Sequence, residues 1–294
     1  MGSTPFRRAA TSALVTAVAA TAAVAVYTPG ASASSVPTWP AAAQSLIHPG
    51  IQTVTNDTAA CTSNFVFTDA VGHAYLGQAA HCSGTGSANE TDGCQSQSLP
   101  LGTPVALGDS GVTGTMVYNS WLAMQKAGEK DANTCAYNDI ALIRIPDNAV
   151  SKVNPSIPAF GGPNGVRTTP MQSGEAVLSY GNSPLRGGVA QLSPKQGIVL
   201  TDDGGGWTHL IYTATPGVPG DSGSGFLDAD GKAFGVLSTL ALAPIPGSNG
   251  VSDLAKMLEY INTHSNIKGL RLANGTENFV PGAVPALSGI AAGL

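Results

Sequence analysis

The sequence predicts an all-β fold that ends in a single helix. Glycine is abundant, with 37 residues, and there are 20 prolines, so turns are frequent. Only 11% of the residues are charged. Short apolar runs recur between the turns, which is typical of β-strands, and one segment near the end of the chain has helical spacing instead.

In the first half of the chain, the clearest element is a hairpin. Two apolar runs are separated by the polar turn 68–72, which is a hairpin pattern. Residues 140–145 are apolar except for Arg144 and are interpreted as a buried strand. The strands expected in this half are 64–67, 74–78, 114–118 and 140–145, with a helical turn at 121–126.

In the second half, short strands continue until the helix begins. Asp228–Gly231 separates the last two of them and predicts a hairpin. The expected strands are 175–180, 196–200, 209–214, 224–227 and 233–239. A helix is predicted from Ser252 as its N-cap, because Leu254, Met257, Leu258 and Ile261 follow at helical spacing.

The N-terminus predicts export. Arg7-Arg8 precedes an uncharged Ala/Val-rich run, and Ala31-Ser32-Ala33 is a small-x-small cleavage site. We therefore expect a secretory signal peptide at 1–33 and a secreted, extracellular protein. The alternative is an N-terminal membrane anchor, which the weak hydrophobicity of alanine disfavours. Residues 34–49 are interpreted as a linker or short propeptide.

Formal charge argues against anionic partners. The whole chain carries −5, and losing residues 1–33 removes two arginines and no acid, which leaves 11 basic against 18 acidic residues, or −7. Nucleic acid or an anionic membrane would favour a basic face, so neither is expected as a partner once the signal peptide is removed. We expect a monomer.

Three segments hold candidate reactive side chains. Ala79-Ala80-His81-Cys82 supplies an imidazole, Asp139 leads into an apolar strand, and Ser222 lies among glycines in the run 217–225. A serine hydroxyl needs a base and a carboxylate to attack at neutral pH. Glycines let the last loop turn sharply and aim the N–H groups of Gly220 and Ser222 at one point, as an oxyanion hole requires.

At these segments the sequence resembles the chymotrypsin-like serine endopeptidases, and the secreted bacterial branch most. Their motifs are Ala-Ala-His-Cys, Asp-Ile-Ala-Leu and Gly-Asp-Ser-Gly, in the same order along the chain. The resemblance covers residues 50–265 and implies two packed six-stranded antiparallel barrels, with a crossing near 153–162 and a C-terminal helix. Residues 266–294 are then a loosely packed tail.

The resemblance implies a role for each of these residues. His81 would be the general base, Asp139 its orienting carboxylate and Ser222 the nucleophile, and the N–H groups of Gly220 and Ser222 would form the oxyanion hole. Ser238 matches the serine that supports the buried aspartate. These residues would cleave peptide bonds in protein or peptide substrates, with no metal and no cofactor.

The resemblance also points to a substrate pocket without charge. Pro216, six residues before Ser222, would lie at its floor, and Thr239, Leu240 and Ala241 would form its wall. Because none of these residues is acidic, we expect a preference for apolar rather than basic side chains before the cut.

Asp221 lacks the partner that zymogen cutting would provide. The sequence has no Ile-Val-Gly-Gly start that could supply a new amine. A buried carboxylate without a partner is costly. We therefore expect an internal cation beside Asp221, with Arg186 as the first candidate.

Four cysteines in an exported chain favour disulfides over a metal site. Three pairings are possible from the residues. The resemblance implies Cys61–Cys82, which leaves Cys94 to pair with Cys135.

Two other functions compete with a serine endopeptidase. One is a non-catalytic homologue that binds proteins through the same cleft, which the complete His, Asp and Ser set disfavours. The other is a zinc hydrolase, but neither His-Glu-x-x-His nor paired-cysteine ligand spacing occurs in the sequence.

Overall fold

The computed structural model describes residues 1–2, 37–57, 60–87, 90–241 and 245–282. The chain divides into two units, residues 1–33 and 34–294, and only the second is discussed here. The predicted signal peptide lies outside the described residues except for its first two. No helix within the described ranges is long and apolar enough to cross a membrane.

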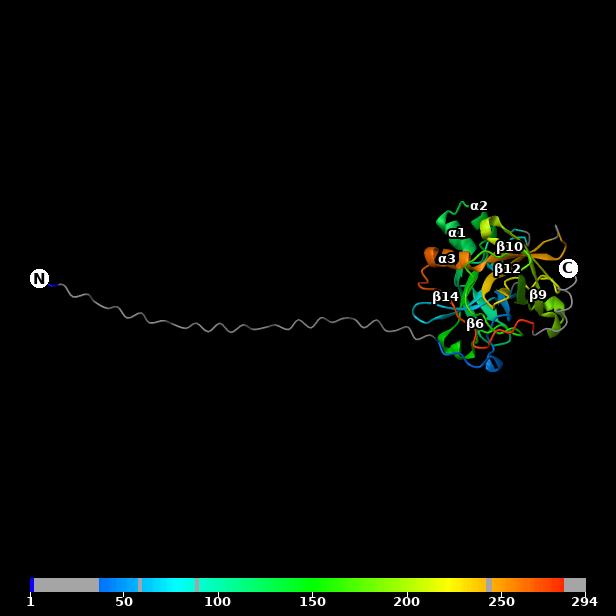
Figure 1. The fold of residues 1–294 in the computed structure, drawn as a ribbon, viewed down its shortest axis with the longest axis horizontal. Helices are drawn as coiled ribbons and strands as arrows, with labels where there is room; N and C mark the ends of the chain where they lie inside the picture. The colour runs from blue at the N-terminus through cyan, green and yellow to red at the C-terminus, as the bar shows by residue number, and fades with distance from the viewer. Residues whose placement is uncertain (3–36, 58–59, 88–89, 242–244, 283–294) are drawn as a thin grey trace. The chain divides into compact units, whose positions relative to one another are not determined.

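The first half of this unit forms an antiparallel sheet of eight strands, in the order β14-β3-β4-β7-β6-β5-β1-β2. Its strands β6 and β14 are labelled in Figure 1. Its strands are β1 Gln52–Thr55, β2 Ala60–Thr62, β3 Val66–Thr68, β4 Ala74–Gln78, β5 Pro104–Leu107, β6 Thr113–Asn119, β7 Ala141–Arg144 and β14 Arg271–Leu272. The predicted hairpin is β3–β4, and the predicted buried strand is β7.

The second half is a closed six-stranded barrel, in the order β10-β13-β12-β11-β8-β9. Its strands are β8 Ala176–Tyr180, β9 Pro194–Asp203, β10 Thr208–Thr213, β11 Gly225–Asp228, β12 Ala233–Ala241 and β13 Ser248–Asp253. The predicted all-β class is confirmed, and the architecture is consistent with two packed barrels. The first sheet has eight strands rather than the six expected: seven come from residues 52–144, and the C-terminal segment adds β14.

Helices are few and short. The α-helices are α1 Ser120–Ala127, α2 Ala132–Tyr137 and α3 Leu254–His264. The 3₁₀ turns are η1 Ala42–Gln44, η2 Ala80–Ser83, η3 Asp147–Lys152, η4 Pro184–Arg186, η5 Ala190–Leu192 and η6 Gly204–Gly206. Helix α3 was predicted, but its N-cap is Asp253 rather than Ser252: the Asp253 carboxylate accepts from the backbone N–H of Lys256 at 2.8 Å.

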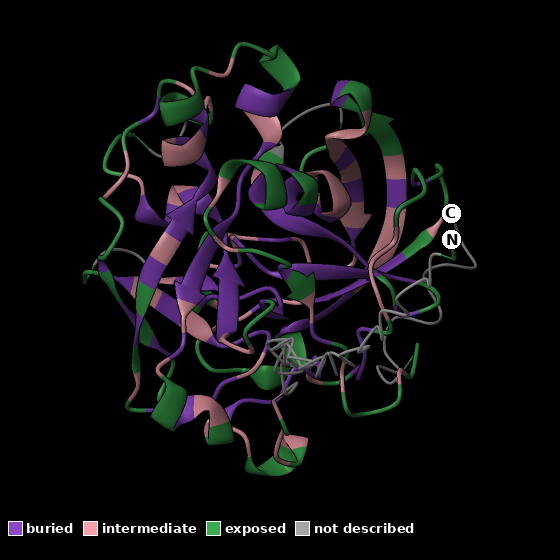
Figure 2. Ribbon diagram, turned by 90° about the vertical axis from the view of Figure 1, so that its left-hand side faces the viewer, coloured by how far each residue is buried: buried purple, intermediate pink, exposed green. Residues whose placement is uncertain are grey.

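The core consists of three main apolar clusters. One fills the first sheet around Leu76 and Ile143, and another fills the barrel around Phe226 and Val251. The third joins the halves and includes Phe65 of the first and Leu227 of the second. Figure 2 shows the buried residues concentrated in the strands. Burying large apolar side chains on both sides of the junction stabilises it, at about 1.5–3 kcal/mol for each side chain.

The beginning of the C-terminal segment is packed, which corrects the expectation of a loose tail. Arg271 and Leu272 pair with Thr68 and Phe67 of β3, and the N–H of Val280 donates to the carbonyl of Phe160 at 2.8 Å. Backbone hydrogen bonds hold this segment in place. The sequence did not predict β14 because a strand of two residues is too short to show alternating apolar and polar residues. Residues 283–294 lie outside the described part.

Candidate active site

His81 and Asp139 form a tightly bonded pair. His81 lies in η2, directly after β4, and Asp139 lies just before β7, which pairs with β4. One carboxylate oxygen, Oδ1, accepts from the backbone N–H of His81 at 2.9 Å, and the other, Oδ2, lies 2.7 Å from the ring Nδ1. Asp139 therefore holds both the backbone and the ring of His81, and among the described residues the other ring nitrogen, Nε2, has no hydrogen-bond partner.

The pair changes the protonation of both groups. Burial disfavours the charged imidazole, but the charge of Asp139 and the hydrogen bond to it outweigh burial, so the pKa of His81 lies above its ordinary value. Burial disfavours the charged carboxylate too. The charge of His81 and the hydrogen bonds from His81 and Ser238 prevail, and they hold the pKa of Asp139 below its usual range.

Ser238 joins this pair from the second half of the molecule. Its Oγ donates to Asp139 Oδ2 at 2.6 Å. Ser238 lies where the register between β12 and β13 shifts, between Leu237 and Thr239. Such bulges can re-aim a side chain, and here the hydroxyl crosses from the barrel to a residue of the first sheet.

Ser222 lies in a tight loop just before β11. The N–H of Asp221 donates to the carbonyl of Val218 at 2.8 Å, and Gly220 has a φ of +96°, which closes a turn that favours glycine. Thr62 of β2 anchors this loop: its Oγ1 donates to the carbonyl of Gly220 and its N–H to the carbonyl of Ser222, both at 2.8 Å. A strand of the first half thus positions the loop of the second.

The loop leaves two backbone donors unused. Among the described residues, the N–H groups of Gly220 and Ser222 have no acceptor, and both residues line one cleft. The Ser222 hydroxyl likewise has no hydrogen-bond partner in the described ranges, His81 included. Such hydrogen bonds are often long before a substrate binds and shorten in the complex.

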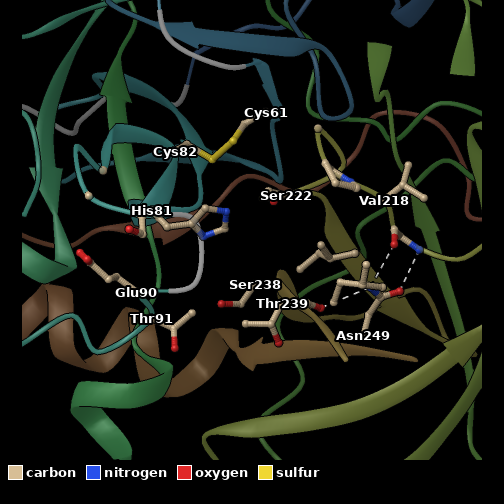
Figure 3. Close-up of a pocket in the computed structure, with 18 of the residues that line it drawn as sticks. Cys61, His81, Cys82, Glu90, Thr91, Val218, Ser222, Ser238, Thr239 and Asn249 are labelled. Carbon is tan, nitrogen blue, oxygen red and sulfur yellow. Dashed lines mark hydrogen bonds between the residues drawn. A yellow bond between two sulfur atoms is a disulfide. The ribbon is translucent and has the colours of Figure 1, made fainter. Parts of the chain in front are cut away.

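The cleft has a volume of about 640 Å³ and is lined by both halves of the molecule. His81, Ser222 and Ser238 line it together, as Figure 3 shows. Thr239 and Leu240 line it as predicted.

Pro216 does not line the cleft, which corrects the predicted pocket floor. Its carbonyl instead accepts from Arg186 Nη2 at 3.0 Å and from Lys195 Nζ at 3.2 Å, so this backbone turns toward buried cations. Ala241 ends β12, with its side chain outside the described part. Gly217 and Asn249 line the cleft here instead. Asn249 was missed because it belongs to β13, a polar strand that no motif marks.

Asp221 is fully buried and pairs with two cations. Arg186 Nη2 contacts its Oδ2, as predicted, and Lys195 Nζ lies 2.9 Å from the same oxygen. Despite burial, hydrogen bonding from Arg186 and the charge of Lys195 hold the pKa of Asp221 below its usual range. Burial lowers the pKa of Lys195 to about 8. Lys195 was missed because it stands alone in a strand, without a motif.

Both predicted disulfides are present. Cys61 is bonded to Cys82, beside His81, and Cys94 is bonded to Cys135. Within the described ranges, the two groupings of possible metal ligands each contain one of these cystines. Because disulfide sulfurs are not thiolates, neither grouping offers a thiolate for a metal.

Comparisons with known proteins found similarity among solved structures. No family model and no curated protein matches the chain. It is similar to Protease A of Thermobifida fusca, with 19% identity, a TM-score of 0.47, and coverage of 78% of this chain and 99% of the other. The Nocardiopsis protease is 20% identical, with a TM-score of 0.47, and the match covers 77% of this chain and 98% of the other. The Cellulomonas bogoriensis chymotrypsin is 18% identical, with a TM-score of 0.45, and the match covers 77% of this chain and 98% of the other. At these values the likeness assigns neither mechanism nor substrate to this chain.

Proposed function

We propose that this protein is a secreted serine endopeptidase that hydrolyses peptide bonds through an acyl-enzyme. The observation that carries the proposal is the two-point attachment of His81 to Asp139, in the same cleft as Ser222. An imidazole held in this way has a defined tautomer, with Nε2 available to accept a proton.

In the proposed reaction, Ser222 Oγ attacks the carbonyl carbon of the substrate while His81 Nε2 takes its proton. Asp139 stabilises the imidazolium that forms. The unused N–H groups of Gly220 and Ser222 stabilise the negative oxygen of the tetrahedral intermediate. His81 then returns the proton to the leaving amine, and a water molecule, deprotonated by His81, hydrolyses the acyl-enzyme.

The edge of β12 supports a peptide rather than a small ester as the substrate. Among the described residues, Thr239–Ala241 pair with β13 and with no other strand. The free edge borders the cleft through Thr239 and Leu240. An extended peptide can add to such an edge by main-chain hydrogen bonds, which would orient it across Ser222.

A serine-directed organophosphonate tests the proposal. The purified protein should be labelled covalently at one site, which peptide mass analysis should assign to Ser222, and it should hydrolyse a peptide library. Ser222→Ala should abolish both labelling and hydrolysis. Ser151→Ala, at an exposed serine outside the cleft, should change neither.

Two outcomes would contradict it. Absence of labelling together with absence of hydrolysis would favour the non-catalytic homologue that binds proteins through the cleft. Hydrolysis that persists in Ser222→Ala would assign the reaction to another group.

A further inference from the structure

Asn249 is a buried amide at the inner end of the cleft. It lies in β13 opposite Leu240 of β12 and is completely buried, yet it borders the cleft. Its Oδ1 accepts from the backbone N–H of Gly217 at 2.8 Å. Its Nδ2 donates to the carbonyls of Gly217 and Thr239, both at 3.3 Å.

These bonds join the two walls of the pocket next to Ser222. Gly217 begins the loop that carries Ser222, and Thr239 belongs to the strand edge on the other side. Figure 3 shows the Asn249 amide between them, with its hydrogen bonds to both walls. An asparagine amide has two N–H donors, and both are used here, so Asn249 offers no free donor to a polar substrate side chain.

The space below Gly217 is already filled. A Cβ built on Gly217 would come within 2.6 Å of Leu237 Cδ1 and within 2.9 Å of both Asn249 amide atoms. Leu237 is itself buried. Leu237 and Asn249 both line the cleft, so a side chain that enters between the two walls meets them.

We propose that Asn249 closes the floor of the substrate pocket and selects small uncharged side chains, such as those of alanine, serine and valine, immediately before the cut. This inference rests on the proposed function, because it assumes that Ser222 attacks the carbonyl of the residue whose side chain enters this pocket. Larger leucine and phenylalanine side chains would have to displace the hydrogen-bonded amide, and overpacking of this kind is unfavourable.

Peptide substrates that differ only in the residue before the cut test the proposal. In the wild-type protein, kcat/KM should fall about 10- to 100-fold from alanine to phenylalanine. Asn249→Ala removes the amide and opens the floor. It should raise the phenylalanine-to-alanine ratio of kcat/KM about tenfold or more, through better cleavage after phenylalanine.

Asn154→Ala is the matched control. Asn154 is also completely buried, and its amide makes three hydrogen bonds, to Pro40, Thr276 and Ser156, outside the cleft. This variant should lose stability but keep the wild-type ratio. If Asn249→Ala does not fold, Leu237→Ala opens the same space and should raise the ratio in the same way.

Equal cleavage after alanine and phenylalanine by the wild-type protein would overturn the proposal. So would an unchanged ratio in a folded Asn249→Ala or Leu237→Ala variant. Organophosphonate labelling of Ser222 separates this failure from that of the proposed function. Labelling with no size preference rejects only the role of Asn249, whereas no labelling and no hydrolysis reject the peptidase itself.

Discussion

The ring of His81 shows how one carboxylate can set both the position and the proton affinity of a base. The Asp139 carboxylate accepts a hydrogen bond from the backbone N–H of His81 and binds its ring. Its Oδ2 also accepts a hydrogen bond from Ser238 Oγ. Asp139 is nearly buried, so its charge acts on His81 with little screening by water. The sequence predicted the pair from two motifs that lie 58 residues apart.

The raised pKa of His81 predicts the acid limb of the pH–rate profile. His81 can accept the Ser222 proton only when its ring is neutral, and the charge of Asp139 makes the ring hold its proton to higher pH than an ordinary histidine. The fall of kcat/KM on acidification should therefore have its midpoint above pH 6.5, the ordinary value for histidine. Measuring kcat/KM against pH with one neutral peptide checks this.

Asp139→Asn is the control for the pH prediction. Removing the charge should move the midpoint of the residual activity to lower pH, and turnover should fall about 10⁴-fold, as the same change does in trypsin-like triads. NMR titration of His81 in Ser222→Ala provides an independent reading. A wild-type midpoint below pH 6.5 would contradict the prediction.

At the scale of elements, the loop that carries Ser222 depends on its neighbours for its shape. Thr62 of β2 binds its backbone from the first half of the molecule. The turn η4 and the strand β9 supply the two cations that meet Asp221 beneath it. Two internal cations, Arg186 and Lys195, thus pair with Asp221, for which the sequence offers no new N-terminal amine.

Arg186→Ala should loosen this loop and reduce activity. Of the cations in the described part of the chain, it leaves Asp221 with Lys195 alone. Breaking a buried pair in this way should cost up to about 3 kcal/mol of unfolding free energy. If the N–H groups of Gly220 and Ser222 lose their alignment, kcat should fall about 10²- to 10³-fold. Urea unfolding and peptide hydrolysis measure the two effects.

Arg167→Ala is the control for this variant. Arg167 pairs with Glu175 at 2.9 Å and with Asp228 at 3.4 Å on the same half of the molecule, and among the described residues its side chain forms no hydrogen bond or ion pair with the Ser222 loop. It should lose some stability and keep its kcat. An equal fall in kcat for both arginine variants would mean that barrel stability, rather than the ion pairs of Asp221, sets the activity.

At the scale of the whole molecule, the cleft exists because two sheets meet. His81 and Asp139 lie beside strands β4 and β7 of the first sheet. Ser222 precedes β11 of the barrel, and Ser238 and Asn249 lie in its strands β12 and β13. The apolar cluster around Phe65 and Leu227 joins the two halves, and the C-terminal strand β14 extends the first of them.

Export and cleavage after Ala33 would leave this whole β unit in the mature protein. When the full chain is expressed in a bacterium that secretes proteins, N-terminal sequencing of the extracellular product should begin at Ser34. Replacing Ala31 and Ala33 by bulky residues should retain the uncut precursor, because the cleavage site needs small side chains. A mature protein that begins at Met1 or Gly2 would contradict the signal peptide.

The fold class, the contact between His81 and Asp139 and the place of Ser222 in the same cleft as His81 could be predicted from the sequence alone. His81, Asp139 and Ser222 stand in short motifs, and short apolar runs between glycine turns mark most strands. Both cystine pairings were also predicted, through the resemblance of the Cys82 segment. Each motif consists of adjacent residues and can be identified without coordinates, and the pairing of distant segments followed from the resemblance that the motifs carry.

Features that depend on distant neighbours required the tertiary structure. Lys195 beside Asp221, Asn249 between the pocket walls and β14 beside β3 are contacts between residues far apart in the chain. The placement of Pro216 was wrong for the same reason, since the backbone there turns toward cations that no local pattern predicts. Burial and pairing depend on which strands the fold brings together, and no run of adjacent residues encodes that.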